Sequence, residues 1–253
     1  MLLESFRNSR VARLYVMDYG LFQVHSNGRI IGLTGQLIET DDDKWIMVDT
    51  GMPPKYADDL EKSSQEDRLY EFGEILEFGA ENLPAGQLSR VGITPQDIDL
   101  LIQTHTHIDH IGGVEEFKHV PMVISKAERA LEKPLYWAGH HPFDWPDEQE
   151  CIEVEGDVEL FPGLTLLETP GHTPGQMSLL LELPETGPVI VTSDTISRPE
   201  ELDEGFAGYW REDLAEKNAH RLMALAKERD AFVIFGHCPR QWPTLRKIPE
   251  YYG

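Results

Sequence analysis

The chain has 253 residues, and its 22 basic and 45 acidic side chains give a formal net charge of −23. This charge argues against nucleic acid or an anionic membrane surface as a partner and disfavours strongly anionic substrates, since like charges repel. Two cysteines provide no disulfide framework, and no apolar stretch reaches the roughly 18 residues that a membrane span requires.

The elements of the first part of the chain are predicted from the periodicity of its apolar residues. Residues 1–7 carry a charge among apolar side chains and no small-residue cleavage site, so they do not resemble a signal peptide, and we expect a cytoplasmic protein. Strands are predicted at about 11–19, 30–40 and 44–49. A polar helical stretch is expected to follow at about 53–63.

The segment Thr104–His110 is the most informative part of the chain. Three imidazoles and one carboxylate fall within six residues, directly after a short apolar run. A chain that leaves a strand can point alternate side chains, here His105 and His107, into one cavity. Asp109 and His110 would then face a neighbouring point. An open catalytic zinc site takes about three protein ligands, so the surplus predicts two metal ions.

Three later runs, at 164–169, 188–193 and 231–236, are predicted to be strands, and each leads to a further ligand-type residue. The residues concerned are His172, Asp194 and His237. In layered α/β proteins, functional sites collect on the loops at the carboxyl ends of strands. These side chains are therefore expected to converge on the first cluster.

Two other segments have a distinct composition. The stretch 134–146 is rich in aromatic and turn residues, and is expected to be either a lid over an apolar acyl pocket or a packed surface loop. The run 210–229 predicts a helix, with Leu214, Leu222, Leu225 and Ala226 on one face. Acidic residues begin this helix and basic residues end it, as the helix dipole favours.

The sequence resembles the metallo-β-lactamase superfamily over nearly its whole length. The resemblance is carried by His105-Thr-His107-Ile-Asp109-His110 and by the three later ligand-type residues. Within the superfamily the chain is most similar to the N-acyl-homoserine lactonases, which are quorum-quenching enzymes, above all through Phe206-Ala207-Gly208. The fold that this implies is one α/β domain over residues 1–253. It is an αβ/βα four-layer sandwich, with two face-to-face mixed sheets and helices outside.

The resemblance also implies a dinuclear site. One metal would be held by His105, His107 and His172, the other by Asp109, His110 and His237, with Asp194 bridging both. The ions are expected to be Zn²⁺, with Mn²⁺, Fe²⁺ or Co²⁺ as alternatives. A hydroxide shared by the metals would open the ester of a lactone, in the first place an N-acyl-homoserine lactone. Asp109 is the expected catalytic residue, which would accept or relay a proton.

Three positions leave alternatives open. Lactonases of this type carry a tyrosine three residues after the bridging aspartate, where this chain has Ser197. Either Tyr209 supplies the hydroxyl group, or the metals activate the carbonyl unaided. Cys238 stands where an acidic residue is common, and is expected to be a free, buried thiol. Asp49 either orients a ligand imidazole or caps the turn that follows it.

The expected partner is a small-molecule substrate with an apolar acyl chain, and neither nucleic acid nor a membrane. The candidate substrate contacts are Phe72, Ser197, Gly208 and Tyr209, with Trp210 beside them. The oligomeric state that we consider for this protein is a homodimer. The alternative functions are a thioesterase of the glyoxalase II type, a phosphotriesterase and, from a different class, a non-enzymatic metal or ligand sensor. The thioesterase normally has an added basic helical region, whereas this chain stops at Gly253, soon after its last ligand-type residue.

Overall fold

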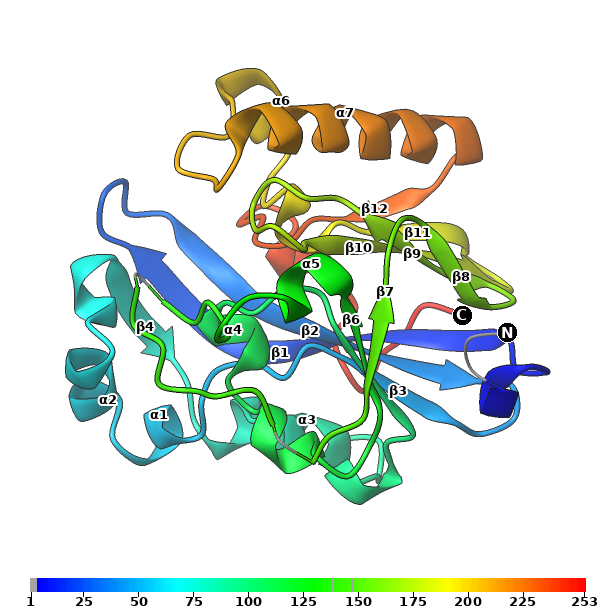
Figure 1. Cartoon of the computed structure of the whole chain (residues 1–253), viewed down its shortest axis with the longest axis horizontal. Coiled ribbons are helices and arrows are strands. Elements are labelled where there is room, and N and C mark those ends of the chain that lie inside the picture. The colour runs from blue at the N-terminus through cyan, green and yellow to red at the C-terminus, as the bar shows by residue number, and fades with distance from the viewer. Residues whose placement is uncertain (1–3, 138, 147) are drawn as a thin grey trace.

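The computed structural model describes residues 4–137, 139–146 and 148–253. Two β-sheets pack face to face, and helices cover their outer faces (Figure 1). The four layers confirm the predicted αβ/βα sandwich with two mixed sheets. Among the described residues, no helix combines the length and the apolar character that crossing a membrane requires.

The larger sheet has seven strands in the order β4-β1-β2-β3-β5-β6-β7. They are β1 (Val11–Val24), β2 (Ile30–Thr40), β3 (Trp45–Val48), β4 (Gly73–Glu77), β5 (Leu100–Gln103), β6 (Met122–Ser125) and β7 (Cys151–Val154). Strands β1 to β4 pair antiparallel, whereas β3, β5, β6 and β7 pair in parallel. The first strand is longer than predicted, because buried Phe22 and Val24 continue its alternation and pair with β4.

The smaller sheet has five strands in the order β12-β11-β10-β9-β8. They are β8 (Val158–Phe161), β9 (Leu164–Glu168), β10 (Met177–Leu183), β11 (Gly187–Val191) and β12 (Phe232–Ile234). All pairs are antiparallel except β11 with β12. The three strands predicted to lead to ligands are therefore β9, β11 and β12, each slightly shorter than expected.

The helices are α1 (Lys55–Asp58), α2 (Leu60–Glu66), α3 (Pro84–Ser89), α4 (Ile108–Ile111), α5 (Lys126–Arg129), α6 (Glu201–Glu204) and α7 (Glu212–Arg229). The helical stretch predicted at about 53–63 is confirmed, but it is divided into α1 and α2 at Asp59. Asp59 adopts extended geometry (φ −152°, ψ 94°), and its side chain accepts a hydrogen bond from the Lys62 amide. It thus ends α1 and caps α2.

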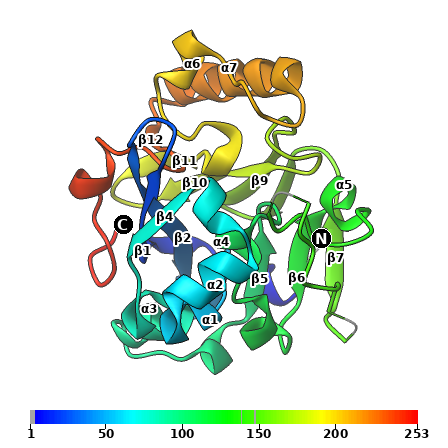
Figure 2. The ribbon, with the colours of Figure 1, turned by 90° about the vertical axis from the view of Figure 1, so that its left-hand side faces the viewer.

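Helix α7 confirms the predicted helix, and of the predicted face Leu222 and Ala226 are buried. Its buried residues include Ala215, Ala219 and Leu222, whereas Leu214 and Leu225 are only half-buried. Figure 2 shows α6 and α7 over the smaller sheet and α1, α2 and α3 beneath the larger one. Small alanine side chains let α7 approach the sheet closely.

The two sheets share an apolar core. Val16 and Ile102 of the larger sheet pack in one cluster with Leu166 and Val191 of the smaller sheet. Separate clusters fill the space between each sheet and its own helices. Central strands such as β5 are consequently buried on both faces, which accounts for their continuous apolar sequences.

Candidate metal centre and substrate cavity

All seven predicted ligand residues lie at one edge of the two sheets, on four loops that each follow a strand. The loop after β5 and the start of α4 carry His105, His107, Asp109 and His110, while the loops after β9, β11 and β12 carry His172, Asp194 and His237. Their ligand atoms form two groups, each with all atoms within 4.8 Å of one another. The first group is His105, His107, His172 and Asp194, and the second is Asp109, His110 and His237.

Asp194 lies between the two groups. Its Oδ2 is 3.2 Å from His172 Nε2 and 3.8 Å from His105 Nε2. Its Oδ1 is 3.2 Å from His237 Nε2 and 3.4 Å from His110 Nε2. The two oxygens of one carboxylate therefore face different clusters of imidazoles, which is the arrangement that a bridging ligand needs.

Several of these atoms lack a partner within the protein. His105 Nε2, His110 Nε2 and Asp194 Oδ1 are buried and make no hydrogen bond within the described part of the chain. A buried polar group left unsatisfied costs about 1–3 kcal/mol, so three such atoms at one point indicate a missing ligand. Imidazole and carboxylate donors fit Zn²⁺, Mn²⁺, Fe²⁺ or Co²⁺, and the residues present therefore fit two divalent ions.

Burial and charge favour the ligand forms of three of these groups, His105, His107 and Asp194. Burial holds the pKa of His105 and His107 well below its ordinary value, so both imidazoles are neutral and can donate a lone pair. Burial opposes ionisation of Asp194, but the nearby imidazoles of His237 and His110 hold its pKa well below the ordinary value. The bridging carboxylate is accordingly charged.

Burial opposes protonation of His110 and His237, but the neighbouring carboxylates of Asp109 and Asp194 raise the pKa of His110 well above its ordinary value and that of His237 to about 9. A metal ion must therefore displace a proton from each of these two imidazoles.

Hydrogen bonds from the opposite ring nitrogens fix two of the imidazoles. His110 Nδ1 lies 2.7 Å from Asp49 Oδ2, and Asp49 also accepts from the amide (2.8 Å) and hydroxyl (2.7 Å) of Thr104. His237 Nδ1 lies 2.9 Å from the Gly32 carbonyl oxygen. Of the two predicted alternatives for Asp49, the structure supports the one that orients a ligand imidazole.

A buried glutamate that the sequence analysis did not single out ties two ligand loops together. Glu128 Oε1 accepts from the amide (2.9 Å) and the hydroxyl (2.7 Å) of Thr106, between the first two histidines. Its Oε2 accepts from the Gly175 amide at 3.0 Å, three residues after His172. Burial raises the pKa of Glu128. No local sequence pattern marks this residue, because its partners lie far away along the chain.

A cavity of about 650 Å³ opens from the two groups toward the surface. All four predicted substrate contacts line it, namely Phe72, Ser197, Gly208 and Tyr209. The Phe72 ring packs against Phe22 (centroids 5.7 Å apart) and Trp137 (5.1 Å), which makes one wall apolar. The expectation for Trp210 is wrong. Its side chain is 53% exposed and does not line the cavity, because its loop turns outward before α7.

The hydroxyl groups of Tyr209 and Ser197 are hydrogen-bonded partners in the cavity. The Tyr209 hydroxyl lies 3.2 Å from Ser197 Oγ and 3.3 Å from Glu201 Oε2, and its ring packs edge-on against His172 at 4.7 Å. Burial raises the pKa of Tyr209 well above its ordinary value, so the phenol is neutral. A neutral phenol can donate a hydrogen bond inside the cavity.

The aromatic stretch 134–146 is mostly a packed loop. Of its described residues, Trp137 alone lines the cavity. The buried Tyr136 hydroxyl instead donates a hydrogen bond of 2.7 Å to Asp67. Ala138 lies outside the described residues. Cys238 is a free, buried thiol, as expected, and belongs to neither ligand group.

Comparison with known proteins agrees with this geometry. The model of the metallo-beta-lactamase superfamily matches residues 37–237, and the chain belongs to this superfamily. Within it, the chain is similar to an N-acyl homoserine lactonase of a Bacillus species, with 33% identity over 237 residues, which cover 85% of this chain and 84% of the relative.

Two solved structures extend the similarity to three dimensions. A mutant of Bacillus thuringiensis AiiA with N-decanoyl-L-homoserine bound at its active site matches with a TM-score of 0.83 at 29% identity, covering 96% of this chain and 100% of that chain. An N-acyl homoserine lactone hydrolase with the product N-hexanoyl-L-homoserine at its catalytic metal centre matches with a TM-score of 0.81 at 30% identity and the same coverage.

Proposed function

We propose that this protein is a metal-dependent hydrolase that opens the lactone ring of N-acyl-homoserine lactones. The observation that carries the proposal is the pair of ligand groups around Asp194, which opens into a cavity with an apolar wall. The similarity to named lactonases over 85% of the chain supports the same substrate class.

The ligand set follows from the two groups. His105, His107 and His172 would hold one ion, Asp109, His110 and His237 the other, and Asp194 both. Zn²⁺ is the proposed ion, because neutral imidazoles and carboxylates at open sites are its usual ligands. When bound, two divalent ions lower the pKa of water to near neutrality and polarise a carbonyl oxygen.

The side chains of the cavity then have distinct roles. Asp109 Oδ2 lies 3.5 Å from both His110 Nε2 and His237 Nε2, and the partly exposed carboxylate would take the proton of the attacking water and pass it to the leaving alkoxide. The Tyr209 hydroxyl, held by Ser197, would donate a hydrogen bond to the lactone carbonyl as negative charge develops there. The acyl chain would lie along Phe72 and its neighbours.

The test is a hydrolysis screen with zinc-loaded protein of measured metal content. We expect two ions per chain and faster turnover of N-hexanoyl- and N-decanoyl-homoserine lactone than of acyl-glutathione thioesters or an aryl dialkyl phosphotriester. Asp194→Ala should lose at least one ion together with activity, whereas exposed Glu155→Ala should lose neither. A preference for thioester or phosphotriester would overturn the lactonase proposal, and a fully loaded, active Asp194→Ala protein would exclude the bridging role.

A further inference from the structure

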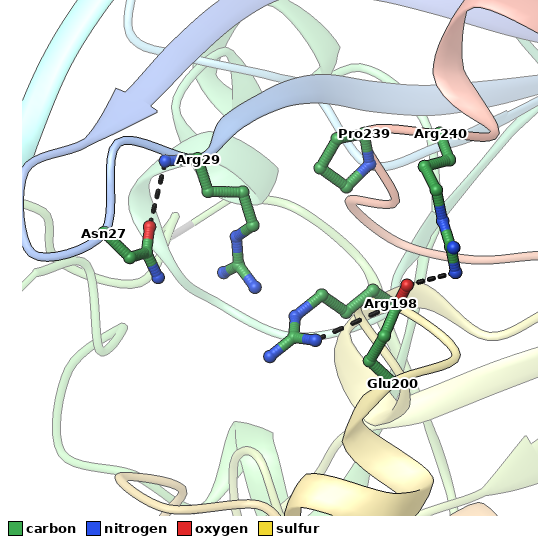
Figure 3. A pocket seen from close by; sticks show the side chains of 6 residues that line it. All are labelled: Asn27, Arg29, Arg198, Glu200, Pro239 and Arg240. Atoms are coloured by element: carbon green, nitrogen blue, oxygen red, sulfur yellow. Dashed lines mark hydrogen bonds and ion pairs between the residues drawn. The ribbon is translucent and has the colours of Figure 1, made fainter.

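A second cavity, of about 220 Å³, adjoins the substrate cavity and is rich in arginine. Its lining residues are Asn27, Arg29, Arg198, Glu200, Pro239 and Arg240 (Figure 3). Three of the six are cationic, in a chain whose formal charge is −23 with only 22 basic side chains among 253 residues. Such a local reversal of charge is unexpected from the composition.

The arginine cavity is continuous with the substrate cavity. Asn27, Arg29 and Arg198 line both of them. Arg29 comes from the connection between β1 and β2, directly before β2, and Arg198 from the loop that follows Asp194. A molecule bound at the metal centre and long enough to cross the substrate cavity would therefore meet these two guanidinium groups.

The carboxylates nearby are already engaged. Glu200 pairs with Arg240 and, at 3.8 Å, with Arg198, which also pairs with Glu204. Glu201 accepts hydrogen bonds from the backbone amides of Ser197 and Arg198.

Arg29 differs from the other two arginines. Its side chain makes no ion pair or hydrogen bond with any residue that the structure describes, and its Nε is buried without a partner. Arg198 Nε is likewise buried and unsatisfied. In Figure 3 the side chains of Arg29 and Arg198 extend into the same part of the cavity from opposite walls. Glu201 and Glu204 lie near enough to Arg29 to act on it electrostatically, but no described carboxylate contacts its guanidinium group, which can therefore bind a further anion.

We propose that Arg29 and Arg198 form a recognition site for a carboxylate carried by the substrate, at the end of the acyl group remote from the lactone. This inference rests on the proposed lactonase function and narrows its substrate class. The planar guanidinium group binds carboxylates through two parallel hydrogen bonds, which makes arginine suited to this task. A substrate with a single carboxylate can bind to this acidic protein, because the arginines act on it at contact distance while the distant surface charges are screened.

The experiment compares homoserine lactones whose acyl chains end in a carboxylate with neutral lactones of equal chain length. N-succinyl, N-adipoyl and N-sebacoyl lactones are paired with N-butanoyl, N-hexanoyl and N-decanoyl lactones, and kcat/KM is measured for the metal-loaded enzyme. At the length that reaches the arginines, we expect the carboxylate to raise kcat/KM by roughly ten- to a hundredfold, the range for a hydrogen bond to a charged group. In the Arg29→Gln variant, the ratio of kcat/KM for the carboxylate-ended lactone to kcat/KM for the neutral lactone should fall close to one. Exposed Arg90→Gln, at the end of α3, should leave it unchanged.

The outcomes separate this proposal from the lactonase proposal. If neutral lactones are preferred at every length and Arg29→Gln does not alter the ratio, the carboxylate site is wrong while the lactonase stands. If no lactone is opened, the lactonase proposal fails, and calorimetry with the ring-opened N-adipoyl- and N-hexanoyl-homoserines decides on the carboxylate site alone. Tighter binding of the adipoyl compound, lost in Arg29→Gln, would support the site, and equal binding would overturn it.

Discussion

Of the two carboxylates among the ligand-type groups, Asp109 is the more exposed in the cavity. Its side chain is 17% exposed, compared with 8% for Asp194. Asp109→Asn keeps the size of the side chain but removes its charge and its ability to accept a proton. We expect kcat to fall by at least roughly tenfold, on the scale of general-base catalysis, with little change in the unfolding temperature. Wild-type kcat in the variant at full metal occupancy would contradict the role.

The hydroxyl of Tyr209 allows a second test at the scale of one atom. A lost hydrogen bond that acts on the transition state costs about 1.5–3 kcal/mol, or roughly ten- to a hundredfold in rate. Tyr209→Phe should lower kcat for lactones by that factor with little change in KM. Ser197→Ala, which removes the 3.2 Å partner of the hydroxyl, should have a smaller effect of the same kind. A change in KM alone would instead make Tyr209 part of the wall of the acyl pocket.

Residues differ in how far they could be predicted from the sequence. The seven ligand-type residues were predictable, because each is either in one short motif or directly follows a strand. Glu128 and Arg29 were not, because their positions depend on contacts between distant segments; Glu128 bonds an amide 47 positions away. The contact between Tyr209 and Ser197 was not predicted either, since a sequence does not show that a loop brings their hydroxyl groups within hydrogen-bonding distance.

At the scale of elements, α5 positions the loops that carry His107 and His172. Glu128→Gln would replace one accepting oxygen by an amide NH2, which cannot accept from Thr106 or Gly175. We expect weaker zinc binding, by roughly ten- to a hundredfold, as for other residues that orient metal ligands. Competition with a chelator measures this affinity. Exposed Glu132→Gln, a few residues later, is the matched control. Equal zinc affinity of the Glu128→Gln variant and the wild type would show that the tie between the loops is not needed.

Helices and strands were predictable where burial dictates the pattern of apolar residues, and less predictable where local hydrogen bonds decide where an element ends. Strands such as β2 and β11 are recognisable because their apolar runs fill the core between the sheets. The break between α1 and α2 depends on the backbone of Asp59 and a single capping bond, which periodicity does not reveal. The face of α7 was only partly predicted, because Ala215 and Ala219 pack against the smaller sheet beside Leu222, and alanine is a weaker signal of burial than leucine.

At the scale of the whole molecule, the order of the strands brings distant segments to one edge. The two sheets share their core, which supports the prediction of one domain over residues 1–253. The ligands come from loops of both sheets, so the site depends on how the sheets pack. The cytoplasmic location and the homodimer stay predictions, and size-exclusion chromatography with light scattering would test the second.

The dependence of the site on both sheets leads to the last prediction, on metal removal. Without ions, buried atoms of His105, His110 and Asp194 would remain without partners, so the folded state loses stability while the unfolded chain is little affected. Free metal at a thousandfold excess over its Kd stabilises the fold by about 4 kcal/mol, which corresponds to roughly 8–16 °C in Tm for a chain of this size. Calorimetry before and after chelation should show this loss, and added Zn²⁺ should restore it. Asp194→Ala should respond less, because it lacks the group that links both ions. A Tm unchanged by chelation, with metal analysis proving that the ions are gone, would mean that the sheets hold the ligands in place without them.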